Sequence, residues 1–452
     1  MSGLALCIYS ALMRLAQPLL RRKMLKRALL EPGYGEAVDE RFGRYRQSPE
    51  KSSTGSSKVA LNLVWVHAVS LGETRTAAIL LKALREQHPG LRVLLTHGTA
   101  TGRAEGQALL RPGDIQVWQP WDTCLVLERF FEHFKPRLGL LMETEVWPCL
   151  VSGAKARSMP LVLVNGRLSD KSLQQALRMS PLAYPAYAAL TAVYAQTELD
   201  AERYQQLGVT VDLGRTGVFG NLKFDAAPSA SQQTVGKAWR SALNQPVVMF
   251  ASSRDGEEAL FLEEIKALAQ QIREHRATEN VAFELPVKWL IVPRHPQRFD
   301  EVAALVVQHG LTLSRRSSWQ RSPFENDEAI CADVWLGDTL GDMPLYYAAS
   351  DVALLGGSFQ KLGGQNLIEA AACGCPVVMG PHTFNFFEAA ELAEFAGAAK
   401  RVADMAGAVN WAVQCVKDPE RQARMSQAAL AFAATHQGAT GRTVQALQGY
   451  LT

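Results

Sequence analysis

Three acidic residues follow apolar runs that read as β-strands. Glu73 comes after the run 61–69, in V-H-A-V-S-L-G-E-T-R, and Glu143 and Glu145 come after the run 138–142, in L-L-M-E-T-E-V-W-P. A carboxylate at such a loop can take a proton from an acceptor hydroxyl, as a general base does. Two structural alternatives stay open. Glu73 could simply stabilise the first turn of its helix, and Glu145 could cap the helix that follows it.

Hydroxyl and basic residues occupy neighbouring loops of the same half of the chain. The loop T-H-G-T-A-T-G-R follows the run 92–96 and opens a helix, an arrangement that suits a phosphate, and N-G-R-L-S-D-K-S adds two basic residues. A basic surface there would suit a phosphorylated acceptor. The residues assigned to acceptor binding are Ser70, Gly72, Thr99, Thr101, Arg103, Arg167, Lys171 and Lys223.

The second half of the chain carries loops suited to a nucleotide. A-S-S-R-D-G-E-E places small hydroxyl residues before a helix, and V-P-R-H-P holds Arg294 between two prolines, where its guanidinium could contact a phosphate or serve a structural role. In L-L-G-G-S-F-Q-K-L-G-G-Q-N-L-I-E-A, glycines let backbone approach a ligand, Asn366 can cap a helix, and Glu369 can accept from ribose hydroxyls. The G-x-G-x-x-G pattern of dinucleotide enzymes does not occur there.

The elements that must position these loops form two series. Predicted strands at 61–69, 92–96, 116–119, 138–142, 161–165 and 192–195 alternate with helical patterns, and a second series follows at 247–252, 289–292, 334–336, 352–355 and 377–379. This alternation predicts an α/β fold of two doubly wound parallel sheets. We expect Rossmann-like domains at 59–220 and 247–417, a linker at 221–246 and C-terminal helices at 418–452. The polar run 48–58 reads as a flexible connector.

Composition sets limits on the function. Of 452 residues, 48% are hydrophobic and 20% are charged, which indicates a globular protein, and a net charge of +3 gives no argument for nucleic-acid binding. Seven scattered cysteines favour a reducing compartment over a disulfide framework. Cys373 and Cys375 lack the paired spacing of a zinc site, so no protein-bound metal is expected.

The N-terminus has the character of a membrane-associating segment, at 1–30. An apolar stretch at 3–20 is followed at once by Arg21, Arg22, Lys23, Lys26 and Arg27. Eighteen helical residues reach only ~27 Å against a ~30 Å hydrocarbon core, and Arg14 lies inside the stretch. An interfacial helix on anionic headgroups fits these magnitudes better than a span. A soluble helix packed on the first domain is the alternative.

Taken in order, the motifs resemble those of the bacterial 3-deoxy-D-manno-octulosonic acid (Kdo) transferases. They are V-S-L-G-E-T, M-E-T-E-V-W-P, N-G-R-L-S, G-N-L-K-F-D, V-P-R-H-P-Q-R-F, G-D-T-L-G-D-M, G-G-Q-N-L-I-E-A and G-P-H-T-F-N-F. The resemblance implies a GT-B glycosyltransferase with a cleft between two Rossmann-like domains, inverting and independent of metals and other cofactors. It implies transfer of Kdo from CMP-Kdo to a lipid A precursor, a tetraacyldisaccharide bisphosphate, at the cytoplasmic face of the inner membrane in lipopolysaccharide biosynthesis.

The resemblance also assigns roles to residues. It makes Glu73 the general base and requires a second acid at Glu143 or Glu145. Many members carry histidine where Arg254 and Gln365 stand in this chain, which makes donor contacts there less secure. The expected donor-binding residues are Ser252, Ser253, Arg254, Pro293, Arg294, His295, Gly337, Thr339, Leu340, Gly341, Gly357, Gly364, Asn366 and Glu369.

Two other functions are consistent with the same pattern. One is a different GT-B nucleotide-sugar transferase acting on a lipid acceptor. The other is a non-catalytic carbohydrate-binding protein at the membrane, against which the acid at position 73 argues, since a binding module needs no base.

Overall fold

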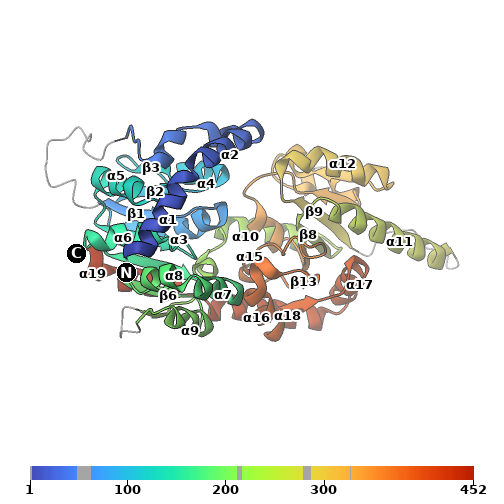
Figure 1. Cartoon of the computed structure of the whole chain (residues 1–452). Helices are drawn as coiled ribbons and strands as arrows, with labels where there is room; N and C mark the ends of the chain where they lie inside the picture. Colours follow the sequence, from blue (N-terminus) through green and yellow to red (C-terminus); the bar gives the residue numbers. More distant parts are fainter. Residues whose placement is uncertain (1–2, 48–62, 211–215, 278–286, 326, 452) are drawn as a thin grey trace. The chain divides into compact units, whose positions relative to one another are not determined.

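The computed structural model describes residues 3–47, 63–210, 216–277, 287–325 and 327–451, which form two compact α/β units (Figure 1). The first unit comprises residues 1–225 and 437–452, and the second comprises residues 226–436. The predicted connector at 48–58 lies outside the described residues.

A parallel sheet forms the centre of the first unit. Its described strands run in the order β3-β2-β1-β4-β5-β6-β7, with β1 flanked by β2 and β4. The central strands β1 and β4 are largely apolar and buried on both faces, as expected for a sheet covered by helices on each side. The strand bounds are β1 (Leu63–His67), β2 (Arg92–His97), β3 (Ile115–Trp118), β4 (Leu138–Met142), β5 (Leu161–Gly166), β6 (Ala192–Ala195) and β7 (Thr216–Val218).

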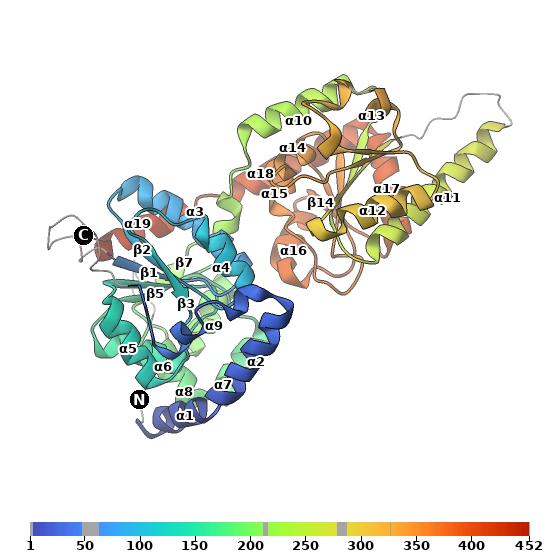
Figure 2. The ribbon, with the colours of Figure 1, turned by 90° about the horizontal axis from the view of Figure 1, so that it is seen from above.

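Helices cover both faces of this sheet. One apolar core joins β1 and β2 to α3 and α19, and a second joins β1 and β3 to α5 and α6, on opposite faces (Figure 2). The helices are α1 (Gly3–Leu15), α2 (Gln17–Leu30), α3 (Leu71–Gln87), α4 (Ala100–Gln107), α5 (Cys124–Phe134), α6 (Pro148–Ala156), α7 (Asp170–Arg178), α8 (Ser180–Tyr187), α9 (Glu198–Gln206) and α19 (Ala439–Leu451), with 3-10 turns η1 (Pro32–Gly35), η2 (Val38–Phe42) and η4 (Leu222–Asp225).

The second unit is built in the same way. Its described strands run in the order β10-β11-β9-β8-β12-β13-β14, all parallel. Strands β10 and β14 were not predicted, because L-S-R and A-K-R are three residues long and largely polar. The bounds are β8 (Val247–Ser253), β9 (Lys288–Pro293), β10 (Leu313–Arg315), β11 (Val334–Leu336), β12 (Val352–Leu355), β13 (Val377–Met379) and β14 (Ala399–Arg401).

One face of the second sheet packs against α11, α12 and α17, while α10 and α14 lie on the other (Figure 2). The helices are α10 (Ala230–Ala242), α11 (Glu257–Ala277), α12 (Phe299–Gln308), α13 (Asp327–Cys331), α14 (Met343–Ala348), α15 (Ile368–Ala372), α16 (Phe387–Phe395), α17 (Met405–Val416) and α18 (Pro419–Thr435), with turns η5 (Pro296–Arg298), η6 (Arg316–Ser318), η7 (Pro323–Glu325) and η8 (Phe384–Phe386).

The predicted domain limits need one correction. The segment 221–246 is not a linker, because η4 completes the first unit and α10 is a regular helix of the second. Residues 418–452 contain helices, as expected, and of these α18 belongs to the second unit and α19 to the first. Asp225 accepts hydrogen bonds from the backbone of Gly438 and Thr440, which joins the chain end to the first unit.

The N-terminal segment consists of two helices rather than one. Helices α1 and α2 meet at Ala16, just before Pro18, and are bent by 47°. Within the described ranges, no single helix has the length and apolarity of a membrane span, although this bent pair meets the criterion when taken together. The backbone N–H of Cys124 donates to the Ser10 hydroxyl (3.1 Å) and Trp121 Nε1 donates to the Met13 carbonyl (3.1 Å), so α1 packs on the first unit.

Candidate active site

Glu73 lies in the first turn of α3, immediately after β1. Ser70 is the N-cap of that helix, and its hydroxyl both donates to Glu73 Oε1 (2.8 Å) and accepts from the Glu73 backbone N–H (3.3 Å). Glu73 Oε2 accepts from the Val69 backbone N–H (2.8 Å). These bonds form a variant of the capping box, in which the carboxylate accepts from the residue before the N-cap, so the structural role considered from the sequence is present.

The same carboxylate also has the electrostatics of a general base. Glu73 is only 8% exposed, and its pKa is raised from 4.5 to about 7, chiefly by burial and next by the charge of Glu145. The bonds from Val69 and Ser70 act against this rise, and Glu143 adds to it. A base with a pKa near the working pH is favourable for proton transfer. Capping fixes the position of the carboxylate while burial adjusts its proton affinity.

Glu145 lies at the same carboxyl end of the sheet as Glu73, because β4 is the hydrogen-bonded parallel neighbour of β1. Trp147 Nε1 donates to Glu145 Oε2 (2.7 Å). Helix α6 begins at Pro148 with Trp147 as N-cap and no side-chain capping bond, so Glu145 does not cap it. Burial raises the pKa of Glu145, and the charge of Glu143 adds to the rise.

Glu143 is held differently. Its backbone has a φ of 59°, a left-handed conformation that is uncommon for a residue other than glycine. Its Oε1 forms an ion pair with Lys223 Nζ (2.8 Å), and Lys223 belongs to η4. Asn165 supports this arrangement, because its Oδ1 accepts from the Leu222 backbone N–H (2.9 Å). Asn165 was not predicted as a site residue, although it stands in the motif N-G-R-L-S.

Substituting Glu145 with Gln tests this coupling. The change removes the second-largest cause of the raised pKa of Glu73, while the new amide oxygen can still accept from Trp147. Activity that needs ionised Glu73 falls below a pH of about 7 in the wild type. We expect the acidic limb of the kcat/KM profile to move to lower pH in Glu145→Gln. Glu202→Gln, at an exposed position of α9, is the control and should leave the acidic limb unmoved. An unmoved limb in Glu145→Gln as well would exclude the coupling.

Other residues assigned to acceptor binding already have protein partners. The Thr99 hydroxyl caps α4, accepting from the Gly102 N–H and donating to the Val69 carbonyl. Arg103 pairs with Glu40 (2.9 Å) and lies over the ring of Trp118. The Arg167 backbone N–H donates to the Glu143 carbonyl (3.2 Å).

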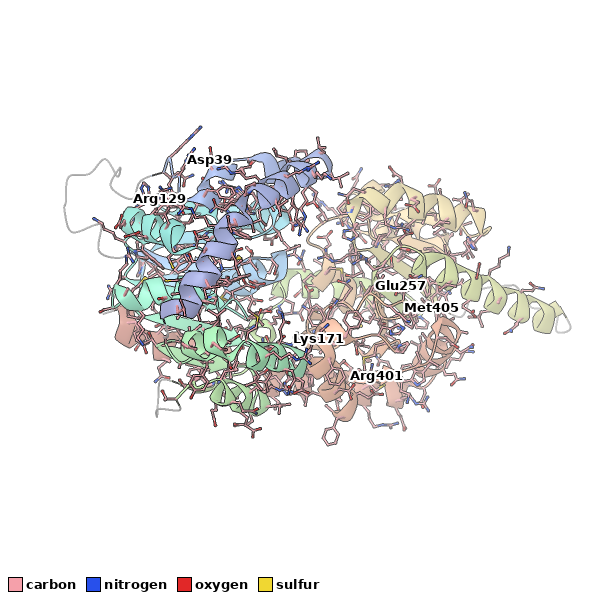
Figure 3. All side chains as sticks on the ribbon, in the orientation of Figure 1. Asp39, Arg129, Lys171, Glu257, Arg401 and Met405 are labelled. Carbon is pink, nitrogen blue, oxygen red and sulfur yellow. The ribbon has the colours of Figure 1, made fainter. Side chains whose placement is uncertain are left out.

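The remaining acceptor residues are one glycine and two exposed side chains. Gly72 lies inside the capping turn of Ser70, at the N-terminus of α3. Thr101 is exposed on α4, and Lys171 is exposed on α7 (Figure 3). The structure therefore brings Ser70, Lys223 and the three acids together.

The donor loops of the second unit follow four adjacent strands, in the order β11-β9-β8-β12. In open parallel sheets, ligands bind beyond the carboxyl ends of the strands, where these loops lie. After β8, Ser252 has a φ of 54°, and Ser253 is 1% exposed with its hydroxyl donating to Glu258 Oε1 (2.9 Å). The Ser253 hydroxyl is thus engaged within the protein. Glu258 also pairs with Arg298 (3.2 Å).

Positive charge gathers where the loops after β8 and β9 meet. The Arg294 backbone N–H donates to the Ser253 carbonyl (3.0 Å), and Ser253 pairs with Pro293 in the sheet. The pKa of exposed His295 is lowered, first by burial and then by the charges of Arg254, Arg294 and Arg298. Arg298 is paired with Asp255, Glu258 and Glu301. Arg254 and Arg294 are therefore the guanidinium groups of this cluster that would suit a phosphate.

The remaining donor residues lie in the loops after β11 and β12. Gly337 leaves no room for a Cβ atom, which would lie 2.7 Å from Val292 Cγ2. Thr339 donates to Asp342 Oδ2 (2.7 Å), while Leu340 is exposed and Gly341 has a φ of 86°.

Backbone bonds within the protein order the glycine-rich loop. The Gly364 N–H donates to the Gly357 carbonyl (2.7 Å), and the Asn366 Oδ1 accepts from the Ile368 N–H (3.1 Å). Glu369 is half-buried in the single short turn of α15. Among the residues that the structure describes, no group of three His, Cys, Asp or Glu side chains is placed to hold a metal ion.

Two Rossmann-like units, with carboxylates at the carboxyl end of one sheet and arginines at the carboxyl end of the other, define the two-domain α/β fold of the GT-B type. The fold is shared with UDP-GlcNAc 2-epimerase from Neisseria meningitidis (TM-score 0.53, 16% identity, 86% of this chain and 100% of that one). It is also shared with Anabaena HepE in complex with UDP (TM-score 0.54, 16% identity, 86% and 99%). These two similarities concern the fold alone.

Sequence similarity identifies the family. The family model of "3-Deoxy-D-manno-octulosonic-acid transferase (kdotransferase)" matches residues 36–226. The 3-deoxy-D-manno-octulosonic acid transferase of Bordetella pertussis is 46% identical over 98% of this chain and 99% of its own length. That of Haemophilus influenzae is 28% identical over 98% of both chains. The chain belongs to the Kdo transferase family, which confirms the predicted resemblance and the predicted glycosyltransferase activity.

Proposed function

We propose that this enzyme transfers Kdo from CMP-Kdo to a lipid A precursor in lipopolysaccharide biosynthesis, with inversion at the anomeric carbon and Glu73 as general base. The observation that carries the proposal is the buried Glu73 carboxylate, whose pKa of about 7 results from burial and from Glu145 beside it. Membership of the Kdo transferase family supports the sugar that is moved.

In the proposed reaction, Glu73 takes the proton of a glucosamine hydroxyl on the acceptor as that oxygen attacks the anomeric carbon of Kdo. The new glycosidic C–O bond forms on the face opposite the leaving group, which inverts the configuration. The bond between the anomeric carbon and the phosphate oxygen breaks, and its electron pair leaves with CMP. Glu73 is then protonated and returns its proton to solvent.

The arginine cluster of the second unit supports an anionic leaving group. Arg254 and Arg294 act on His295 from neighbouring loops, so a phosphate there would meet more than one guanidinium group. Charge-assisted bonds of this kind stabilise the charge that develops on a departing phosphate. On the acceptor side, Lys223 is paired with Glu143 (2.8 Å), which offsets the charge of one of the three acids.

A single-turnover assay with CMP-Kdo and purified lipid A precursor tests the function. We expect Kdo to appear on the precursor, and we expect CMP, but not UDP, to raise the melting temperature. Stabilisation by UDP alone would favour a different nucleotide-sugar transferase. Binding of CMP-Kdo without turnover would favour a non-catalytic protein.

We also propose that α1 and α2 hold the enzyme on anionic lipids at the cytoplasmic face of the inner membrane. Several large apolar side chains of these helices are exposed, and a basic run accompanies them. An apolar face next to basic residues is typical of interfacial helices. The exposed apolar residues are Leu4, Ile8, Leu12, Leu15, Leu19, Leu25, Leu29 and Leu30.

Replacing Arg22, Lys23 and Lys26 together by Gln is expected to weaken binding to phosphatidylglycerol vesicles on the order of 100-fold, since each basic residue contributes about 1 kcal/mol. Vesicle co-sedimentation at low and high salt measures this loss. A matched control replaces the exposed Lys82, Arg111 and Lys155 by Gln. Equal losses in both triple variants would remove α2 from this role.

A further inference from the structure

A buried carboxylate in the second unit lies between two of the donor loops. Glu257 is the first residue of α11 and is 0% exposed (Figure 3). Its Oε2 accepts from the Gly357 N–H (2.7 Å) and the Arg254 N–H (3.1 Å), and its Oε1 accepts from the N–H groups of Phe359 (3.1 Å) and Gln360 (3.3 Å). One side chain thus binds four backbone donors from the loops after β8 and β12.

These four bonds leave the carboxylate with little room for another partner. Successive backbone N–H groups in a glycine-containing turn form a concavity that binds anions. In this protein the anion is the side chain of Glu257, so the N–H groups of Gly357, Phe359 and Gln360 are directed at the protein and not at a ligand. Burial raises the pKa of Glu257, and the four N–H bonds counteract that rise.

Steric contacts show that the two loops are closely fitted. A Cβ atom on Gly356 would lie 2.2 Å from the Ser252 carbonyl oxygen, and one on Gly256 would lie 2.6 Å from Gln360 Nε2. Gly256 and Gly357 have φ angles of 81° and 71°. The loops after β8 and β12 can therefore meet only where glycines stand at the contact. Glu257 holds both loops in the backbone conformation that allows this contact.

We propose that Glu257 is a positioning residue for the nucleotide-sugar donor, which orders the 356–366 loop against the arginine-bearing loop after β8 before the donor arrives. The inference rests on the proposed donor site of the second unit. Arg254, whose N–H Glu257 binds, belongs to the cationic group around His295. Ordering both loops in the free protein lowers the conformational entropy that donor binding must otherwise remove.

The substitution Glu257→Gln tests this role with little change in volume. Glutamine offers one acceptor oxygen where the carboxylate offers two, and its NH₂ group would face two N–H donors. We expect the KM for CMP-Kdo to rise about tenfold or more, with a smaller change in kcat and an unchanged KM for the lipid acceptor. Glu263→Gln, on an exposed position of the same helix, is the matched control.

Hydrogen exchange can be measured first in the wild type, without any substitution, and then in the variant. In the wild type without nucleotide, the amides of Gly357, Phe359 and Gln360 should be protected, and CMP should add little. The same amides should exchange freely in Glu257→Gln. Amides that become protected only when CMP is added would overturn the proposal, as would a donor KM within twofold of wild type in the variant. If wild type itself bound no CMP, the donor-site assignment would fail instead.

Discussion

Replacing Glu73 by Gln is expected to lower kcat for Kdo transfer by ~10²–10⁴-fold while CMP binding is retained, because general-base catalysis contributes about that much. Glutamine can preserve the capping bonds to Val69 and Ser70, so the loop should keep its shape. Single-turnover kinetics measure the loss, and calorimetry with CMP shows that the nucleotide still binds. Turnover near that of wild type would remove Glu73 from the role of base.

A second variant separates the two roles of this carboxylate. Ser70→Ala removes the N-cap hydroxyl and should cost about 1 kcal/mol of stability, with turnover reduced far less than in Glu73→Gln. If both variants lost the same turnover, Glu73 would be a capping residue and not a base.

The pH dependence of stability gives an independent check on Glu73. Its folded-state pKa of about 7 lies above its ordinary value of 4.5, so the folded protein binds this proton more tightly than the unfolded chain. The wild type should therefore lose roughly 3 kcal/mol of stability between about pH 4.5 and pH 7 through this group alone. Denaturant unfolding of Glu73→Gln should show a correspondingly smaller fall across the same interval.

Replacing Arg294 by Ala is expected to weaken CMP-Kdo binding by roughly 10- to 150-fold, since a hydrogen bond to a charged group contributes about 1.5–3 kcal/mol. Its backbone N–H bond to Ser253 does not involve the side chain and should persist. Calorimetry with CMP measures the change directly. Lys266→Ala on the exposed side of α11 is the control. An affinity equal to that of wild type would assign Arg294 a structural role instead.

Much of the fold was predictable because buried parallel strands leave a strong local signal. Strands β4, β6, β11, β12 and β13 have the bounds expected from their apolar runs. The missed strands β7, β10 and β14 are edge strands whose sequences, T-G-V, L-S-R and A-K-R, lack the continuous apolar run that marks the equally short β11 and β13. The return of the last helix, α19, to the first unit leaves no local signal in the sequence.

The candidate site was predictable in part. Glu73, Glu143 and Glu145 were found because acids that follow strands of one parallel sheet lie together at the carboxyl end of that sheet. The partners of those acids were not found, because Lys223 reaches Glu143 from a segment 80 positions away in the sequence, held by Asn165. Thr99, Arg103 and Ser253 were expected to serve ligands, yet each has a protein partner: a local one for Thr99 and Ser253, and for Arg103 the distant Glu40.

The amino-acid sequence by itself determined two parallel α/β units, the family, and which acids and arginines stand at the ends of strands. These follow from local periodicity and from motifs a few residues long. Only the tertiary structure decided that Glu73 is buried beside Glu145, that Lys223 neutralises Glu143, and that Glu257 occupies the glycine-rich loop. The reason is physical: proton affinity and hydrogen-bond partners depend on burial and on charges from distant segments, which no local pattern records.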